Sequence, residues 1–307
     1  MNNVATKKKA NVSASDNVIN IVTCIVYILF AFICVYPFYY IFINSISSND
    51  LSANGKILFY PMGIQIKNYY NVFKLEGLFT SFIVSVERTL LGTVLTVMAS
   101  AFLGFMFSQQ DMWMRKFWYR FTIITMYFNA GIIPWYLTMK SMGLTNNFLA
   151  YVLPTVVSPF FLILVKTYVE SIPKELQEAA EIDGASLMTF FFKILIPIIK
   201  PILATIAIFA AVAQWNSFQD TLLLVTDDKL YTLQYTLFQY INQATSVMQT
   251  LNLQNSGSAA LQSLASKQTP TSVRMTVTII VVVPIMLVYP FFQRYIEKGI
   301  IIGAVKG

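Results

Sequence analysis

Histidine is absent from the 307 residues, and cysteine occurs only twice, at Cys24 and Cys34. Without histidine the chain lacks the commonest general base and metal ligand. Two cysteines without a C-x-x-C spacing provide neither a zinc signature nor a disulfide framework, so we expect both to be small buried hydrophobic residues. A Gly-x-x-x-x-Gly-Lys-Ser/Thr loop is also missing, so the chain is not expected to bind ATP by itself. We therefore predict no catalytic residue, metal or cofactor in this chain.

Charged residues are scarce as well, at 11% of the sequence against 56% hydrophobic residues, and the mean hydropathy is +0.62. Soluble domains carry roughly a quarter charged residues. A fold of this size could not hide so much apolar surface from water, so the sequence predicts a protein embedded in membrane lipid. The net charge is +7, but lysine and arginine lie between apolar runs, which favours loops beside an anionic leaflet over nucleic-acid binding.

Six apolar segments are long enough for a helix to cross the hydrocarbon core, which takes about 20 residues. The sequence therefore predicts an all-α integral membrane fold with six transmembrane helices. The first segment is too long for a signal peptide and is expected to stay in the membrane. Prolines in the third and fourth segments are expected to bend these helices. The segments are, approximately, Val18–Ile43, Phe82–Phe107, Phe117–Met139, Phe148–Tyr168, Ile194–Trp215 and Val273–Phe292.

With the N-terminus placed in the cytoplasm, the segments on the cytoplasmic side contain more lysine and arginine than the segments on the outer side. By the positive-inside rule, both termini are then cytoplasmic. This gives a cytoplasmic tail over residues 1–17, a transmembrane domain over 18–292 and a second cytoplasmic tail over 293–307. The outer loop 216–272 is too polar to span and is expected to hold a short helix near 230–242. A second short helix is expected at the outer interface within 45–80.

The inner loop 171–193, between the fourth and fifth segments, has a helix signature of its own. Pro173 suits a first turn, and Glu175 suits the positive end of the helix dipole. Gly184 can adopt a positive φ and end the helix, and a second helix is expected to start near Ser186. The result would be a short charged cytoplasmic helix fused to a transmembrane segment, through which a partner could push on the bundle. Its carboxylates offer charge-assisted contacts.

The same loop resembles a known family. The run Glu178-Ala179-Ala180, then Asp183-Gly184-Ala185, with Pro197 further on, resembles the coupling motif of type I ABC importer permeases. Trp215-Asn216 and the C-terminal run from Tyr289 to Gly307 are similar to the carbohydrate-uptake (oligosaccharide) branch, which includes the maltose-type permease subunits. The resemblance covers nearly the whole chain after Val18. It implies that the coupling to an ATPase subunit is carried by Glu178, Ala179, Ala180, Asp183, Gly184, Ala185 and Pro197.

The resemblance also implies the partners. The chain would be a multi-pass subunit in a bacterial cytoplasmic membrane, paired with a second permease subunit in a heterodimer. Two ATP-binding subunits would hold ATP and Mg, and an extracellular solute-binding protein would deliver a sugar or oligosaccharide. Transport would proceed by alternating access.

Sugar contacts require hydrogen-bonding groups and aromatic faces near mid-membrane. Each candidate could equally hold helices together or lie at the interface, and the second permease could instead hold most of the contacts. The candidates are Tyr127, Asn129 and Trp135 on the third segment, and Gln214, Trp215, Asn216 and Gln219 around the end of the fifth.

Glu87 and Arg88 lie within the second segment, where relatives are usually uncharged. Since a charge at the bilayer centre costs about 2.5–3.5 kcal/mol on insertion scales, we expect an interfacial position or mutual pairing. The otherwise uncharged segments argue against charged substrates. Three alternatives stay open: a permease for another solute, a membrane enzyme acting on a lipid-linked sugar, and a channel or ion-coupled carrier. Which sugar is carried, and its length and linkage, are open too.

Overall fold

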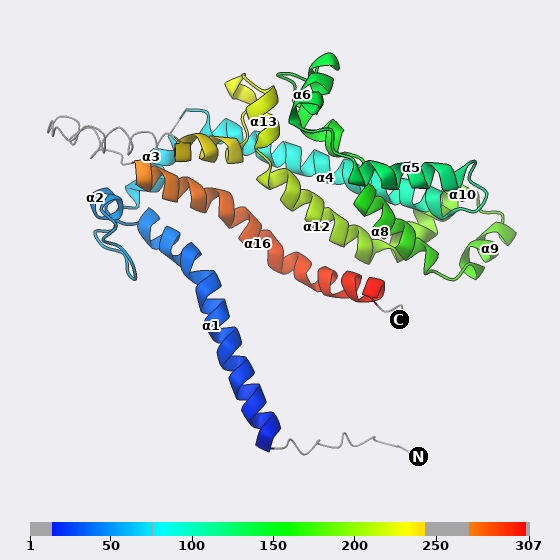
Figure 1. Cartoon of the computed structure of the whole chain (residues 1–307), viewed down its shortest axis with the longest axis horizontal. Helices are drawn as coiled ribbons and strands as arrows, with labels where there is room; N and C mark the ends of the chain where they lie inside the picture. The colour runs from blue at the N-terminus through cyan, green and yellow to red at the C-terminus, as the bar shows by residue number, and fades with distance from the viewer. Residues whose placement is uncertain (1–13, 75, 243–269, 305–307) are drawn as a thin grey trace.

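The computed structural model describes residues 14–74, 76–242 and 270–304 (Figure 1), and every regular element within them is a helix. The predicted all-helical class is therefore confirmed for these residues. The elements are α1 Ala14–Ser45, α2 Asn49–Ala53, α3 Lys67–Phe73, α4 Leu78–Ser108, α5 Arg115–Tyr127, α6 Ile132–Ser141, α7 Leu149–Val152, η1 Leu153–Thr155, α8 Pro159–Glu170, α9 Glu175–Ile182, α10 Leu187–Thr189, η2 Phe190–Leu195, α11 Ile196–Ile198, α12 Lys200–Asn216, α13 Gln219–Leu224, η3 Asp228–Leu230 and α16 Pro270–Ala304, with a further helix at 233–242.

Two helices of the described residues, α1 and α4, are each long and apolar enough to cross a membrane. Two bent pairs meet the same test when taken together: α7–η1 with α8, bent by 45°, and α10–η2–α11 with α12, bent by 78°. In α16 the apolar stretch is shorter, Val273–Val288. The third predicted segment is divided into α5 and α6 by non-helical residues 128–131. Six membrane crossings therefore remain a prediction.

Helix α4 is the central element of the bundle, because α8 and α12 both pack along it, and α16 lies against α12. Most of its buried residues are small (glycine, alanine, serine or threonine), which allows neighbouring helices to approach closely, as is usual between membrane helices. At Gly104 an added Cβ would lie 2.6 Å from the Cβ of Val165 on α8. At Gly92 it would lie 2.4 Å from Nε2 of Gln214 on α12.

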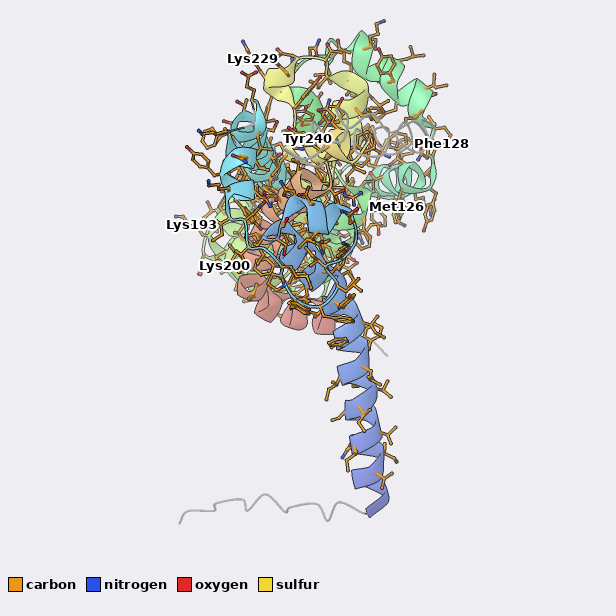
Figure 2. All side chains as sticks on the ribbon, turned by 90° about the vertical axis from the view of Figure 1, so that its left-hand side faces the viewer. Met126, Phe128, Lys193, Lys200, Lys229 and Tyr240 are labelled. Atoms are coloured by element: carbon orange, nitrogen blue, oxygen red, sulfur yellow. The ribbon has the colours of Figure 1, made fainter. Side chains whose placement is uncertain are left out.

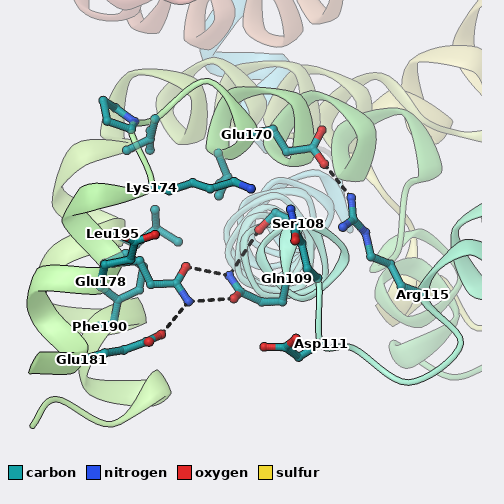
Figure 3. A pocket seen from close by; sticks show the side chains of 15 residues that line it. Ser108, Gln109, Asp111, Arg115, Glu170, Lys174, Glu178, Glu181, Phe190 and Leu195 are labelled. Carbon is teal, nitrogen blue, oxygen red and sulfur yellow. Dashed lines mark hydrogen bonds and ion pairs between the residues drawn. The ribbon is translucent and has the colours of Figure 1, made fainter.

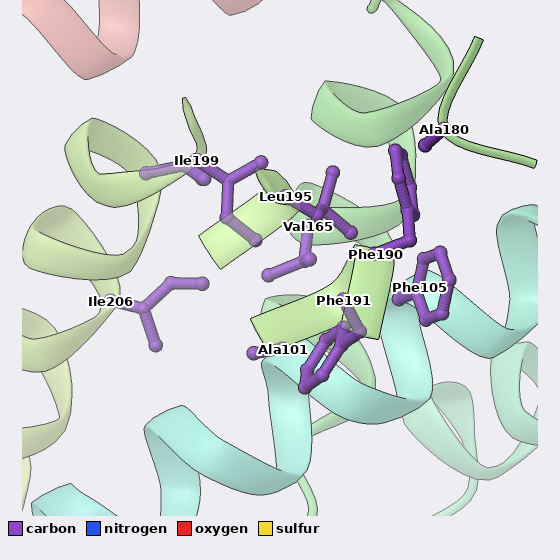
Figure 4. Packing of buried hydrophobic residues seen from close by; sticks show 10 residues of the cluster. Ala101, Phe105, Val165, Ala180, Phe190, Phe191, Leu195, Ile199 and Ile206 are labelled. Carbon is purple, nitrogen blue, oxygen red and sulfur yellow. The ribbon is translucent and has the colours of Figure 1, made fainter. Parts of the chain in front are cut away.

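An apolar core closes one end of the bundle (Figure 4). The rings of Phe105 on α4 and Phe191 on η2 are 5.2 Å apart, and Phe190 packs on the same ring at 6.1 Å. Because η2 is a π-helix, it turns both neighbouring phenylalanines into this core. The chain then bends at the buried residue Ile199 before α12 continues.

Helix α1 extends away from the rest of the molecule and meets it at its C-terminal end, near α2 and α16 (Figures 1 and 2). Its apolar side chains from Val18 to Phe38 are exposed. Cys24 and Cys34 are exposed among them, so the expectation of buried cysteines is wrong for the isolated chain. A helix this apolar needs lipid or another protein around it.

Hydrogen-bonded polar side chains join α1 to the segment that follows it. Asn44 accepts a hydrogen bond from Ser52 at 2.8 Å, and Asn68 donates to the carbonyls of Ser45 and Ser47. The predicted short helix within 45–80 is present as α3, and the one near 230–242 is present at 233–242. The rest of the predicted outer loop, 243–269, lies outside the described residues.

Candidate functional site

Helix α9 occupies the loop that resembles the coupling motif. Its first turn forms on the carbonyl of Lys174, which accepts from the amides of Gln177 and Glu178. Gly184 has φ +78°, and its amide donates to the carbonyl of Glu181 at 3.0 Å. The next amide reaches back to the carbonyl of Ala180 at 2.9 Å, which completes a Schellman-type end. The helix and the positive φ at Gly184 thus match the prediction from sequence.

Ser186 begins the following helix, because its hydroxyl accepts from the amide of Thr189 at 3.2 Å. This hydrogen bond is a typical N-cap. The chain therefore leaves α9, turns at Gly184 and enters α10 within four residues. Such a tight connection fixes α9 to the helix that leads into the bundle.

The two faces of α9 differ. Ala180 is only 6% exposed and packs on the core around Phe190, and Ala185 is partly buried against the same core. Ile182 is 87% exposed. The remaining residues of the motif, Glu178, Ala179, Asp183 and Gly184, are exposed, and so is Pro197 in the first turn of α11. Small residues therefore anchor one face of the helix, and Glu178 and Asp183 lie on its exposed side.

A polar cavity of about 500 Å³ lies between α9 and the ends of α4 and α8 (Figure 3). Two amide side chains cross it. Gln177 donates to Gln109 at 2.9 Å and to Glu181 at 3.0 Å, and Gln109 donates back to Gln177 at 3.4 Å. This reciprocal pair is a direct polar link between α9 and the end of α4.

Next to the cavity, an ion-pair cluster joins α5 to α8. Glu170 accepts from Arg115 at 2.9 Å and from Lys166 at 2.7 Å. The ammonium group of Lys166 also lies 4.5 Å from the ring centre of Tyr119. The pair between Arg115 and Glu170 is partly exposed, so it contributes at most about 1 kcal/mol.

The candidate sugar contacts fall into two groups in the structure. Gln214 and Trp215 are buried and hold helices together. Gln214 donates to the hydroxyl of Thr155 at 2.7 Å, and the indole N–H of Trp215 donates to the carbonyl of Val281 at 3.0 Å. Trp215 also meets Phe82 edge to face, with ring centres 6.3 Å apart.

The other candidates lie at or near the surface. Tyr127 is 81% exposed at the end of α5, and Asn129 accepts a hydrogen bond from the amide of Gly131 in the break that follows. Trp135 on α6 is partly buried. Asn216 and Gln219 are exposed on either side of the α12–α13 junction. Because α6 packs against α13 (Figure 1), Trp135 on α6 and Gln219 on α13 lie on the same side of the molecule.

Of the two alternatives predicted for Arg88, the pairing with Glu87 is wrong, because Glu87 is exposed, and the interfacial position stays a prediction. Arg88 is 1% exposed and forms two hydrogen bonds with Asp220, at 2.5 and 3.2 Å. It also donates to Gln214 at 3.1 Å and stacks over the ring of Tyr151 at 4.5 Å. The bundle therefore contains a buried, internally neutralised ion pair. The presence of a basic and an acidic residue in or next to apolar segments was the only signal in the sequence.

Comparisons with known proteins place the chain in a family. The family model described as "Binding-protein-dependent transport system inner membrane component" matches residues 10–302. The polygalacturonan/rhamnogalacturonan transport system permease protein YtcP of Bacillus subtilis is 31% identical, over 91% of this chain and 95% of the relative. The arabinooligosaccharides transport system permease protein AraQ of Halalkalibacterium halodurans is 28% identical, over 90% of this chain and 93% of the relative.

A solved structure agrees. A chain of a bacterial ABC transporter involved in the import of the acidic polysaccharide alginate has a TM-score of 0.81 and 28% identity, over 92% of this chain and 98% of that one. The family and these relatives are transporter components rather than enzymes. The chain therefore belongs to the binding-protein-dependent transport system inner membrane components, and it is a permease subunit of an ABC importer.

Proposed function

We propose that this chain is one permease half of an ABC importer that moves an oligosaccharide into a bacterial cell by alternating access. The observation that carries the proposal is the similarity to transporter chains named for oligosaccharides and polysaccharides. The match covers nearly the whole of this chain and nearly the whole of each relative. Six transmembrane segments over 18–292, flanked by cytoplasmic tails 1–17 and 293–307, fit this function. With this topology α9 would lie on the cytoplasmic side, where ATP is available.

In this proposal α9 transmits the energy of ATP hydrolysis. Its exposed face would enter a cleft of an ATP-binding subunit, and the two such subunits would hold the ATP and Mg. The anchored face, through Ala180 and Ala185, would pass the movement to the core around Phe190. The residues proposed for coupling are Glu178, Ala179, Ala180, Asp183, Gly184, Ala185 and Pro197.

The exposed apolar surface of α1 supports a second permease subunit and lipid as neighbours. An extracellular solute-binding protein would deliver the oligosaccharide. Among the candidate sugar contacts, the exposed residues Tyr127, Asn129, Asn216 and Gln219 can reach a passing ligand, and Trp135 is partly accessible. Gln214 and Trp215 would contribute by holding the helices in place.

Acidic oligosaccharides are the first substrate class to test. One relative is named for polygalacturonan and rhamnogalacturonan, and the solved transporter imports alginate, so both handle uronic-acid polymers. Neutral arabinooligosaccharides are the second class, because another relative is named for them. The buried Arg88 adds a positive charge within an apolar segment that was expected to be uncharged in its interior, and Asp220 neutralises it.

The test combines purification with uptake. The tagged chain, purified in mild detergent from its own host, should bring with it one other permease and two copies of an ATPase. Cells that lack the chain should lose uptake of radiolabelled trigalacturonate or arabinotriose, and the restored gene should recover it. Purification without an ATPase, or unchanged uptake of both sugars in the deleted strain, would contradict the proposal.

A further inference from the structure

The junction between α12 and α13 lies beside α4, about a third of the way along that helix from its start. Helix α12 ends at Asn216, Ser217 has extended backbone angles, and α13 starts at Gln219. Arg88 donates to the carbonyl of Ser217 at 3.3 Å, so the junction is level with Arg88. Arg88 lies about 15 Å along α4 from Leu78, at 1.5 Å per residue. The junction is therefore well inside the length of a membrane-spanning helix.

Irregular backbone at membrane depth is tolerated where protein groups satisfy it or where it lines a water-filled space. Here Arg88 and Asp220 satisfy both sides of the junction. Arg88 holds the carbonyl of Ser217, and Oδ1 of Asp220 accepts from the hydroxyl of Ser217 at 3.2 Å and from the amide of Thr221 at 2.9 Å. The ion pair between Arg88 and Asp220 then ties the junction to α4.

The polar side chains around the junction point in different directions. Gln214 points inward to Arg88 and Thr155, whereas Asn216 and Gln219 on either side of the junction are exposed. Amide side chains provide both donors and acceptors, which sugar hydroxyls require. A junction that moved or refolded would present these two amides differently.

We propose that Arg88 and Asp220 are positioning residues, which hold the α12–α13 junction so that Asn216 and Gln219 face the aqueous translocation pathway and hydrogen-bond the hydroxyls of the oligosaccharide. This inference rests on the proposed function. A charged pair suits the task better than an apolar one, because an apolar pair would leave the buried carbonyl of Ser217 without its donor. Removing only one partner leaves a buried charge uncompensated.

Gly92 belongs to the same arrangement. The side chain of Gln214 passes directly over it, so that a Cβ there would lie 2.4 Å from Nε2 and 2.7 Å from Cδ of Gln214. Gly92→Ala therefore displaces Gln214 from Arg88 without altering any charge. It provides a second, independent disturbance of the same network.

The first arm of the experiment measures water access in the complete importer in membranes. Cys24 and Cys34 are replaced by serine, and single cysteines are introduced by Asn216→Cys, Gln219→Cys and Thr221→Cys. A membrane-impermeant methanethiosulfonate reagent should label positions 216 and 219, which are exposed, and leave position 221, which is fully buried. Absence of labelling at both 216 and 219 would overturn the inference, since these residues would then not face water.

The second arm adds the disturbances to the Thr221→Cys background. Arg88→Gln, Asp220→Asn and Gly92→Ala should each raise labelling of position 221 by at least about tenfold, because each leaves a buried group without its partner. Arg88→Lys should restore part of the protection. Unchanged labelling in all three variants would show that the pair does not position the junction.

Arg115→Gln is the matched control, because it breaks an arginine–carboxylate pair that is partly exposed and lies near the other end of α4. It should leave labelling of positions 216, 219 and 221 unchanged. An equal rise in this control would mean that the bundle loosens generally, and the specific role of Arg88 would be refuted.

The third arm measures uptake of trigalacturonate and arabinotriose per assembled complex. Arg88→Lys and Asp220→Asn should raise the apparent KM at least about threefold, with a smaller fall in maximal rate, because positioning affects binding of the sugar first. A fall in maximal rate at constant KM would indicate a structural role alone. If neither sugar is transported by the unaltered importer, the proposed function fails, and the labelling arms still decide the role of Arg88.

Discussion

Replacing Gly184 tests whether α9 transmits movement, because the structure separates backbone strain from steric clash at this position. Gly184 has φ +78°, and an added Cβ would meet no atom within 4 Å. The cost of Gly184→Ala is therefore the strain of a left-handed residue, about 1–2 kcal/mol. A change of this size alters the ratio of formed to unformed helix ends about 5- to 30-fold. We expect α9 to lose its fixed relation to α10.

Gly143 is a matched control for this change. It ends α6 with φ +70°, also has no atom within 4 Å of an added Cβ, and donates to the carbonyl of Lys140 at 3.1 Å. The next amide, of Leu144, reaches the carbonyl of Met139 at 3.0 Å, as Ala185 does at the end of α9. Gly143→Ala should therefore cost the same strain at a helix with no proposed role in coupling.

The assay measures membrane abundance, retention of the ATPase subunits and sugar uptake for each variant. Gly184→Ala should retain near-normal abundance but lose ATPase subunits or uptake, and Gly184→Val should be more severe. Gly184→Asn should be milder, because asparagine tolerates left-handed backbone better. Equal loss of uptake per complex in Gly143→Ala and Gly184→Ala would refute the reasoning, because strain anywhere in the fold would then suffice.

Three further predictions follow from the contacts. Gln177→Ala removes the amide pair with Gln109, which is worth about 1 kcal/mol. The ratio of sugar transported to ATP hydrolysed should fall. An unchanged ratio would show that this link carries no movement. Gly104→Ala should lower the thermal midpoint of the purified complex, since overpacking against α8 costs about 1–3 kcal/mol and exceeds the gain of about 1 kcal/mol in helix propensity; a raised midpoint would contradict the packing seen here. A cysteine at Lys7 should react only in permeabilised cells and one at Asp227 in intact cells, and the reverse pattern would invert the proposed topology.

Local sequence signals predicted those parts of the structure that depend only on neighbouring residues. The helix at α9 follows from a proline and acidic residues at its start, and its end follows from Gly184, because a positive φ is determined by the neighbouring backbone alone. The helix that starts after Ser186 follows from its capping hydroxyl in the same way. The length of α4 follows from an uninterrupted apolar run.

The third predicted segment was less regular than its composition suggested. Asn129, Gly131 and Pro134 lie close together in this segment, and the proline alone predicts a bend within one helix. In the structure Gly131 has φ +88°, and the helix is interrupted over residues 128–131. A glycine with this conformation shortly before a proline ends one helix and lets the next begin with the proline in its first turn. The glycine followed by the proline is therefore the signal in the sequence for two helices instead of one bent helix.

The pairing of Arg88 with Asp220 could not be predicted from local pattern. The two residues are separated by 132 positions in the chain, and the contact exists only because α12 ends beside the first half of α4. The alternative partner, Glu87, is adjacent in sequence but cannot face the same way, since successive residues of a helix point in different directions. Charged residues within apolar segments should therefore be matched first with opposite charges at the ends of other segments.

Helix α4 connects the two regions for which a role is proposed. Gln109, just beyond its end, contacts α9, and Arg88 holds the α12–α13 junction about 30 Å away, at 1.5 Å per residue. Between them the helix is continuous and close-packed against α8 and α12, so a shift at one end cannot be absorbed within it. Combining Gln177→Ala with Arg88→Lys separates the two contacts: if α4 carries the movement, the effects on uptake should be non-additive although the sites are far apart. Strict additivity would show that α9 and the α12–α13 junction act independently of each other.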